Sequence, residues 1–124
     1  MLSNNPFIYI ISEDLVFIRL IEVMFNNKLI EAQVERISSY IELKEKRFRI
    51  PPGIILLDDH IPGASSLEVI TFLRYNRRLE CPIYLFCEGA SEFSDKAMQR
   101  GANHCYFKPF KPRLVVNEII DNLK

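Results

Sequence analysis

Residues 54–63 read IILLDDHIPG, and this stretch decides the fold that we expect for the rest of the chain. Its four consecutive apolar residues are typical of a strand buried on both faces, as the central strands of a parallel sheet are. Asp58, Asp59 and His60 follow at once, and Pro62 and Gly63 then indicate a turn. Ligands bind at the carboxyl ends of the strands in open α/β sheets. The stretch therefore predicts a central strand that carries acidic side chains to a functional edge.

Four other short apolar runs have the length of strands: Phe7–Ile11, Leu29–Val34, Ile83–Cys87 and Cys105–Phe107. The second run alternates apolar and polar residues, which favours a strand at an edge of the sheet.

Segments with helical periodicity separate these strands. They cover Leu15–Phe25, roughly 39–47, the residues after Ser65 and Ser66, roughly 92–100, and the residues from Pro112 onward. Strands and helices thus alternate five times, and this alternation predicts an α/β fold with a parallel sheet covered on both sides. Right-handed crossovers favour one arrangement. We expect one domain over residues 1–124, a single five-stranded doubly wound parallel sheet of strand order 2-1-3-4-5 with five helices.

The composition excludes several classes of function. Lysine plus arginine equals aspartate plus glutamate, at 16 each, so no net charge attracts nucleic acid or an anionic membrane. Three cysteines without a CxxC pair favour a reducing compartment over a disulfide framework. The apolar stretch Phe7–Ile11 is too short for a signal peptide or a membrane span. We therefore expect a cytoplasmic protein with neither a nucleic-acid nor a membrane partner.

Several chemically useful side chains follow the expected strands. Ser12, Glu13 and Asp14 come after the first strand, Asp58 ends the third, and Lys108 ends the fifth. Strands of a parallel sheet end at the same edge, so these groups are expected to converge. Clustered carboxylates demand a cation, and oxygen ligands select magnesium or manganese over zinc. Asp58 is preferred to Asp59 as the residue facing this site, because neighbouring strand residues point in opposite directions.

The spacing of these residues resembles that of response-regulator receiver domains in two-component signalling, chemotaxis receivers among them. Pro62 lies four residues after Asp58, and Gly101-Ala102 precedes Lys108-Pro109-Phe110 at the distance usual for the family. The resemblance covers essentially the whole chain and implies a flavodoxin-like fold.

The same resemblance implies the roles of single residues. Asp58 would take a phosphoryl group from a histidine kinase or phosphotransfer protein, with self-phosphorylation and self-dephosphorylation as the most that the chain catalyses. Lys108 would bind the phosphoryl oxygens, and Cys87 stands where a hydroxyl residue normally hydrogen-bonds them. Mg²⁺ would be held by Glu13, Asp58 and the backbone carbonyl of His60. The Lys108–Pro109 peptide bond is usually cis in this family.

Four residues depart from the receiver pattern. Ser12 replaces one of two acidic residues, which weakens the expected magnesium site because affinity for hard cations follows ligand charge. Cys87 is a weak hydrogen-bond donor in place of serine or threonine. Glu88 replaces a small residue, and Cys105 replaces an aromatic residue that normally rotates on activation. A shifted register, in which Glu13 and Asp14 form the acidic pair, is a second interpretation.

These departures leave two functions open. One is a phosphoacceptor that signals through the face formed by the fourth helix, fifth strand and fifth helix, without an output domain of its own. The alternative is a phosphorylation-independent pseudo-receiver that acts as a protein-interaction module. A phosphatase with an aspartate nucleophile is disfavoured, because His60 stands where such enzymes carry an acid. A nucleotide site lacks a glycine-rich loop.

Overall fold

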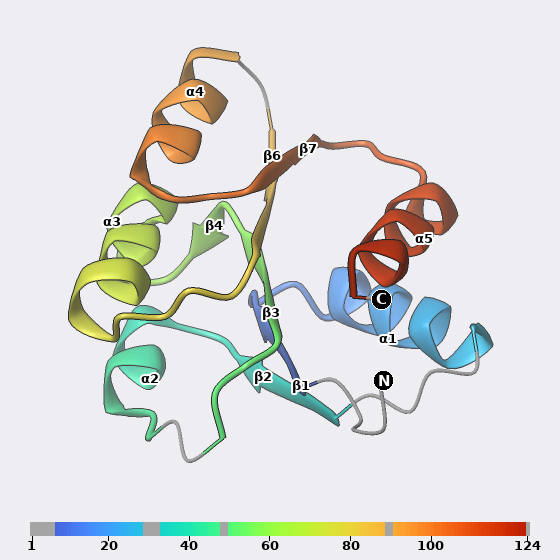
Figure 1. Ribbon diagram of the computed structural model, residues 1–124, viewed down its shortest axis with the longest axis horizontal. Helices are drawn as coiled ribbons and strands as arrows, with labels where there is room; N and C mark the ends of the chain where they lie inside the picture. Colours follow the sequence, from blue (N-terminus) through green and yellow to red (C-terminus); the bar gives the residue numbers. More distant parts are fainter. Residues whose placement is uncertain (1–6, 29–32, 48–49, 89–90, 124) are drawn as a thin grey trace.

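A computed structural model describes residues 7–28, 33–47, 50–88 and 91–123. Its centre is a five-stranded sheet of order β2-β1-β3-β6-β7, in which every pairing is parallel (Figure 1). The strands are β1 (Phe7–Ile11), β2 (Gln33–Ile37), β3 (Ile54–Asp58), β6 (Ile83–Cys87) and β7 (His104–Phe107). This order confirms the doubly wound sheet predicted from the sequence.

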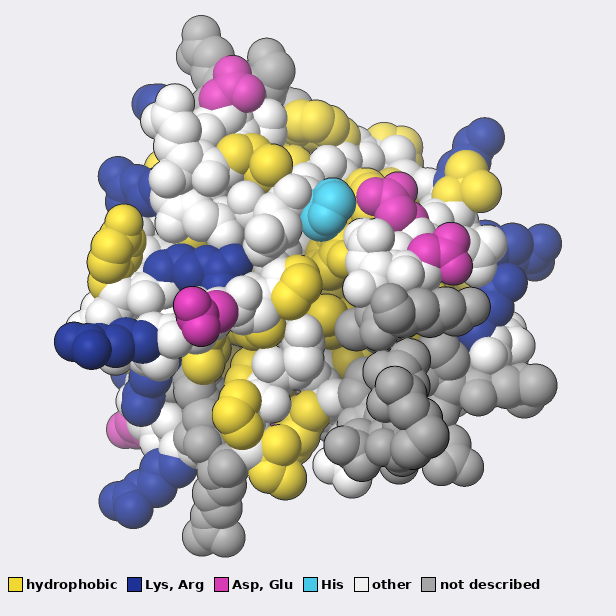
Figure 2. Space-filling view, in the orientation of Figure 1, with side chains coloured by type: hydrophobic (Ala, Val, Ile, Leu, Met, Phe, Trp, Pro, Cys, Tyr) yellow, Lys and Arg dark blue, Asp and Glu magenta, His cyan; other side chains and the backbone are white. Residues whose placement is uncertain are grey.

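Helices cover both faces of the sheet. Figure 1 shows α1 and α5 on one side of the strands and α2, α3 and α4 on the other. The helices are α1 (Leu15–Asn27), α2 (Tyr40–Glu45), α3 (Ser66–Thr71), α4 (Ser91–Arg100) and α5 (Pro112–Leu123); a π-helical turn, η1 (Phe72–Asn76), continues α3. No helix of the described residues is long and apolar enough to cross a bilayer. Lysine and arginine side chains stand mostly at the rim of the face shown in Figure 2.

Each face of the sheet packs into its own apolar core. Alternate residues of β1 divide between them, with Ile8 and Ile10 facing α1 and α5, and Tyr9 and Ile11 facing α2 and α3. The strand β3 is buried throughout, as its continuous apolar run predicts. Burial on both faces fixes the sheet firmly, so the polar groups at its carboxyl edge rest on a rigid base.

The second strand extends beyond its predicted end. Leu29–Val34 was predicted, the described strand covers Gln33–Ile37, and residues 29–32 lie outside the described part of the chain. Val34 packs against the core with α1, while Ile37 is fully buried in the opposite core, opposite Ile11 in the ladder. Alternation alone does not fix where an edge strand ends, because only pairing with β1 decides which residues are covered. Its position at the edge is confirmed.

The start of α1 is set by Asp14. Its carboxylate Oδ1 accepts hydrogen bonds from the backbone N–H groups of Val16 and Phe17, at 3.0 and 3.2 Å. These are two of the donors that a helix leaves unpaired at its first turn. Asp14 is therefore occupied as the N-cap, and Ser12 and Glu13 form the short link between β1 and the helix.

A short hairpin follows β3. It consists of β4 (His60–Ile61) and β5 (Ala64–Ser65), and Gly63 between them has a positive φ of 97° that favours glycine. Ser65 then caps α3 by accepting a hydrogen bond from the N–H of Glu68 at 3.2 Å. The hairpin sets the direction in which residues 59 and 60 leave the sheet.

Candidate functional site

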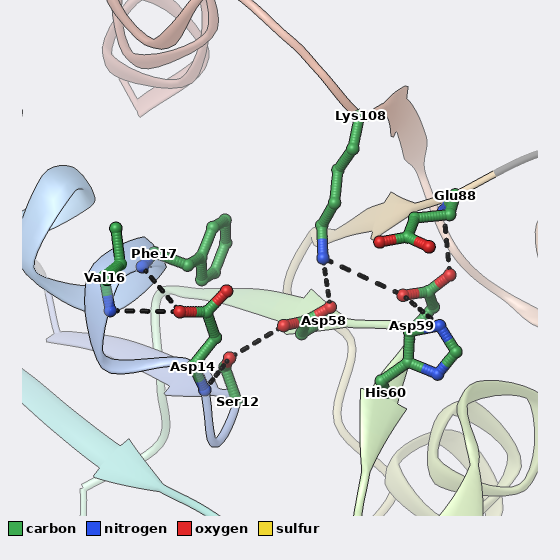
Figure 3. A network of polar contacts seen from close by, with 9 residues as sticks. All are labelled: Ser12, Asp14, Val16, Phe17, Asp58, Asp59, His60, Glu88 and Lys108. Carbon is green, nitrogen blue, oxygen red and sulfur yellow. Dashed lines mark hydrogen bonds and ion pairs between the residues drawn. The ribbon is translucent and has the colours of Figure 1, made fainter.

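Asp58 lies at the end of β3 and is only 2% exposed. Its Oδ1 atom accepts a hydrogen bond from Lys108 Nζ at 2.7 Å, and its Oδ2 atom accepts one from Ser12 Oγ at 2.8 Å (Figure 3). The three residues come from the ends of β1, β3 and β7, as the sequence predicts. A carboxylate held on both oxygens by a cation and a hydroxyl is a positioned group, and hydrogen bonds to charged partners are the stronger kind.

Ser12 is fully buried and is itself oriented by the backbone. The N–H of Asp14 donates to Ser12 Oγ at 3.0 Å, and the hydroxyl donates onward to Asp58. Ser12 thus places a neutral donor at the position where the receiver pattern has an acidic residue. Asp14 caps α1 and does not supply that carboxylate, so the interpretation with Glu13 and Asp14 as the acidic pair is not supported.

Lys108 follows β7 and reaches across the site. Its backbone N–H donates to the carbonyl of Cys87 at 2.9 Å, and the Lys108–Pro109 peptide bond is cis, as the resemblance implies. Burial lowers the pKa of Lys108, but the hydrogen bond and charge of Asp58, with the charges of Asp59 and Glu88, outweigh it and raise the pKa above its ordinary value. Lys108 therefore stays a cation at neutral pH.

Asp59 is a residue that the sequence reasoning placed away from the site. It directly follows β3, its backbone N–H donates to the carbonyl of Phe86 on β6 at 3.0 Å, and its Oδ1 atom lies 3.9 Å from Lys108 Nζ (Figure 3). Its Oδ2 atom accepts a hydrogen bond from the N–H of Glu88 at 2.9 Å. Burial raises the pKa of Asp59 above its ordinary value, and the hydrogen bond from the N–H of Glu88, with the charges of His60 and Lys108, opposes this only in part. Two consecutive acids at a strand end were the available signal.

Cys87 ends β6 and is fully buried. Burial raises the pKa of its thiol to about 11, with smaller contributions from Cys105 and Asp59. The thiol is therefore protonated at neutral pH and is a weak donor. Cys105, half-buried on β7, points its thiol toward the carbonyl of Ser94 at 3.9 Å. The role of Cys87 toward a phosphoryl group stays a prediction.

The magnesium ligands implied by the resemblance are Glu13, Asp58 and the carbonyl of His60. Carboxylate and carbonyl oxygens are the donors that Mg²⁺ takes. Each oxygen of Asp58 accepts one hydrogen bond, and the side chain of Glu13 is exposed in the link between β1 and α1. Among the described residues, no three His, Cys, Asp or Glu side chains gather into a metal-binding group. Their roles as ligands stay predictions.

Comparison with known proteins gives similarity in sequence over part of the chain. No family model matches it. A segment of 69 residues, 55% of the chain, is 33% identical to the autoinducer 2 sensor kinase/phosphatase LuxQ of Vibrio parahaemolyticus. That segment spans 8% of the length of LuxQ, so the activity of the whole kinase does not transfer to this chain.

Solved structures give similarity in fold over nearly the whole chain. A CheY-like response regulator receiver domain protein from Methanospirillum hungatei is 20% identical with a TM-score of 0.82, covering 97% of this chain and 94% of the other. The response regulator DrrB of Thermotoga maritima is 16% identical with a TM-score of 0.81; 97% of this chain covers 53% of that protein. The chain therefore has the fold of response-regulator receiver domains, which confirms the resemblance predicted from its sequence at the level of fold.

Proposed function

We propose that this chain is a receiver domain of two-component signalling that accepts a phosphoryl group on Asp58. One observation carries the proposal: the Asp58 carboxylate is held at the carboxyl edge of the sheet by Lys108 Nζ at 2.7 Å. Few structural roles require a buried aspartate and a lysine 50 residues apart to meet at that edge. The resemblance to receiver domains gives this arrangement a use, because their aspartate and lysine at this edge take part in phosphoryl transfer.

Phosphoryl transfer to Asp58 requires few other groups of the protein to take part in bond making or bond breaking. A carboxylate oxygen has two lone-pair positions, so an oxygen of Asp58 can keep its hydrogen bond and still attack phosphorus. Attack on a phosphohistidine would form the O–P bond of an acyl phosphate and break the N–P bond, and the leaving imidazole would take up a proton. Lys108 offers a positive charge beside the incoming oxygens. Positioning and electrostatics account for most of the catalysis in phosphoryl transfer.

The test is phosphorylation of the purified chain by a small phosphodonor. Wild type is incubated with acetyl phosphate, with and without Mg²⁺, and its intact mass is measured over time. We expect a gain of one phosphoryl group that Asp58→Asn abolishes and that Lys108→Ala slows strongly. Asp121→Asn, a change of an exposed acid on α5, is the matched control and should gain the group as wild type does. Equal labelling of the Asp58→Asn variant would exclude Asp58 as the acceptor.

A second candidate function is a pseudo-receiver that binds its partner without phosphorylation. The crowding of Asp59 and Glu88 around Lys108 favours it, since an arriving phosphoryl dianion would meet two further carboxylates. Under this function, wild type gains no phosphoryl group from acetyl phosphate while Asp58→Asn keeps full partner binding. A partner that binds the phosphorylated form alone would exclude it.

Two protein partners would act on this chain, one as the phosphodonor and one as the downstream target. A histidine kinase or phosphotransfer protein would supply the phosphoryl group in the cytoplasm, and a downstream protein would read the face formed by α4, β7 and α5. Phe107 and Leu114 on that face are 41% and 60% exposed, a larger exposure than apolar side chains of a closed core have. Loss of downstream binding on replacing Leu114 with a charged residue, with phosphorylation unchanged, would support that assignment.

A further inference from the structure

A cleft of about 590 Å³ lies at the amino ends of β3 and β6, at the edge of the sheet opposite to Asp58. Two segments that lead into these strands line it, namely Pro51 and Pro52 before β3 and residues 77–81 before β6. Apolar residues and two arginines dominate this lining, with the carboxylate of Glu80 beside them. The cleft therefore combines an apolar wall with positive charge, away from the site of the proposed phosphoryl transfer.

The fold holds the walls of this cleft in place. The Nη1 atom of Arg74 donates to the carbonyls of Leu79 and Cys81, both at 2.8 Å. The two lining segments are joined where the N–H of Ile55 donates to the carbonyl of Pro82 at 2.9 Å. A surface that is rigid before its ligand arrives loses less conformational entropy on binding.

Arg77 connects the cleft to the end of α2. Its Nη2 atom donates to the carbonyl of Lys44 at 2.6 Å, and its guanidinium carbon lies 5.3 Å from the centre of the Phe72 ring. The ends of α2 and η1 therefore lie side by side (Figure 1). Besides Arg77, these two segments carry the exposed cations Lys44, Arg47 and Arg78. The region around the cleft is thus positive on a chain whose formal net charge is zero.

Arg78 has a backbone conformation that favours glycine. Its φ of 55° lies in the left-handed region, where no other described residue except glycine has its φ. The turn ends the helix, because the N–H of Leu79 donates to the carbonyl of Leu73 at 3.0 Å. A side chain at such a position costs free energy. That of Arg78 is exposed and has no hydrogen bond or ion pair with the other described residues, so nothing it contacts there offsets the cost. Conformations of this kind are concentrated at functional positions.

We propose that this cleft binds a short acidic segment of a partner protein. A carboxylate of that segment would pair with the guanidinium of Arg78 through two parallel hydrogen bonds. A neighbouring apolar side chain would pack against Pro51 and Leu79. Arginine is among the residues that contribute most to binding energy at protein interfaces. The inference does not depend on phosphorylation of Asp58.

A nucleic acid fits this surface less well than an acidic peptide does. Duplex DNA carries one negative charge per about 1.7 Å, and the carboxylates of Glu45 and Glu80 stand in the same two segments as the cations. Successive residues of an extended peptide are about 3.3 Å apart, so its acids can be spaced to avoid these carboxylates. The apolar wall also has no counterpart in a phosphate backbone. Charge and apolar area together therefore favour a peptide.

The test uses an acetylated and amidated peptide of sequence Asp-Glu-Leu-Glu-Asp as the probe, and the peptide Asn-Gln-Leu-Gln-Asn as its uncharged counterpart. The isotope-labelled full chain is titrated with each at low salt, and amide chemical shifts are followed by NMR. We expect saturable shifts confined to residues 44–47 and 77–81 with the acidic probe, and at least fivefold weaker binding of the uncharged one. Added NaCl should weaken binding of the acidic probe, because salt screens exposed charges.

Two variants should change the affinity in opposite directions. Arg78→Gly should weaken binding of the acidic probe roughly fivefold and should not lower the melting temperature, because glycine suits the left-handed backbone. Glu80→Gln should strengthen binding about twofold, since it removes a like charge from the cleft. Arg113→Ala changes an exposed arginine on α5, across the sheet, and is the matched control that should bind as wild type does.

Three outcomes would overturn the proposal. One is equal binding of the uncharged peptide, which would mean that the carboxylates are not recognised. Another is unchanged binding in Arg78→Gly, which would place the probe elsewhere on the chain. The third is tighter binding of a thymidine oligonucleotide of the same length, which would make the surface a nucleic-acid site. Thermal unfolding of each variant shows that it is folded before it is titrated.

Discussion

At the amino ends of β6 and β7, the guanidinium of Arg74 uses all five of its donors within the protein. They reach the carbonyls of Leu79, Cys81 and Gly101 and the side-chain oxygen of Asn103, at 2.7 to 3.1 Å. At the carboxyl ends of β3 and β6, by contrast, Asp58, Asp59 and Glu88 surround Lys108, and one oxygen of Asp59 is left without a hydrogen bond.

The difference separates a structural network from a functional one. A polar network that serves the fold is satisfied internally, because each buried group without a partner costs free energy. A network that serves binding or catalysis leaves some polar groups without a partner inside the protein. Such locally unfavourable arrangements are expected at functional sites. The two edges of one sheet thus carry opposite kinds of polar organisation, and four predictions test the contrast, from the largest expected effect to the smallest.

Replacing Arg74 with alanine should lower the free energy of unfolding by about 3 kcal/mol, since several carbonyls lose their donor at once. Urea unfolding followed by circular dichroism measures this. Arg100→Ala, which removes one exposed hydrogen bond to Thr71, is the control and should cost less than about 0.5 kcal/mol. If Arg74→Ala lowers the free energy of unfolding no more than Arg100→Ala does, the network around Arg74 does not stabilise the fold.

At alkaline pH, the thiol of Cys87 at the carboxyl edge of the sheet should make the stability of the chain depend on pH. Its thiol has a pKa of about 11 in the fold, against 9.0 ordinarily. The unfolded chain therefore loses this proton first, and wild type loses stability as pH rises from 9.0 through about 11. Relative to Cys87→Ala, the decline should reach about 2 kcal/mol. Unfolding under reducing conditions at stepwise pH measures it; parallel curves for the two proteins would contradict the assignment.

Ser12→Asp should place a second carboxylate beside Asp58 and strengthen Mg²⁺ binding there. The new carboxylate loses the donor to Asp58 Oδ2 and adds like charge, so the variant should be less stable without metal and bind Mg²⁺ on the order of tenfold more tightly, about 1.4 kcal/mol. The rise in melting temperature with added MgCl₂ measures the affinity. Ser12→Asn keeps a neutral side chain and is the control. Equal magnesium dependence in both variants would show that the charge at position 12 is not decisive.

Asp59→Asn should stabilise the chain by about 1 kcal/mol at neutral pH, because it removes a buried charge that is only half paired. Asp58→Asn should do the opposite, since it leaves Lys108 without its closest partner. Urea unfolding of the two variants compares them directly. If both variants lose stability equally, the Asp59 carboxylate stabilises the fold as much as that of Asp58 does. Asp59 would then not be an incompletely paired group of the carboxyl edge.

Much of the fold could be predicted because its signals are local. The run IILL at residues 54–57 and Pro112 at the start of the last helix each act within a few residues. The end of the second strand could not be predicted, because an edge strand obtains its limits from pairing with its neighbour in the sheet. The convergence of Asp58 and Lys108 could also be predicted, since parallel strands end at one edge.

What the sequence by itself determined is the alternation of strands and helices, and with it the meeting of Asp58 and Lys108, because hydrophobic periodicity and chain direction suffice for both. What only the tertiary structure decided is the state of the groups around them. Ser12 turns toward Asp58 because the N–H of Asp14 holds its oxygen, and Asp59 lies beside Lys108 with its other oxygen held by the N–H of Glu88. Hydrogen-bond partners and burial depend on three-dimensional proximity, which sequence spacing does not encode.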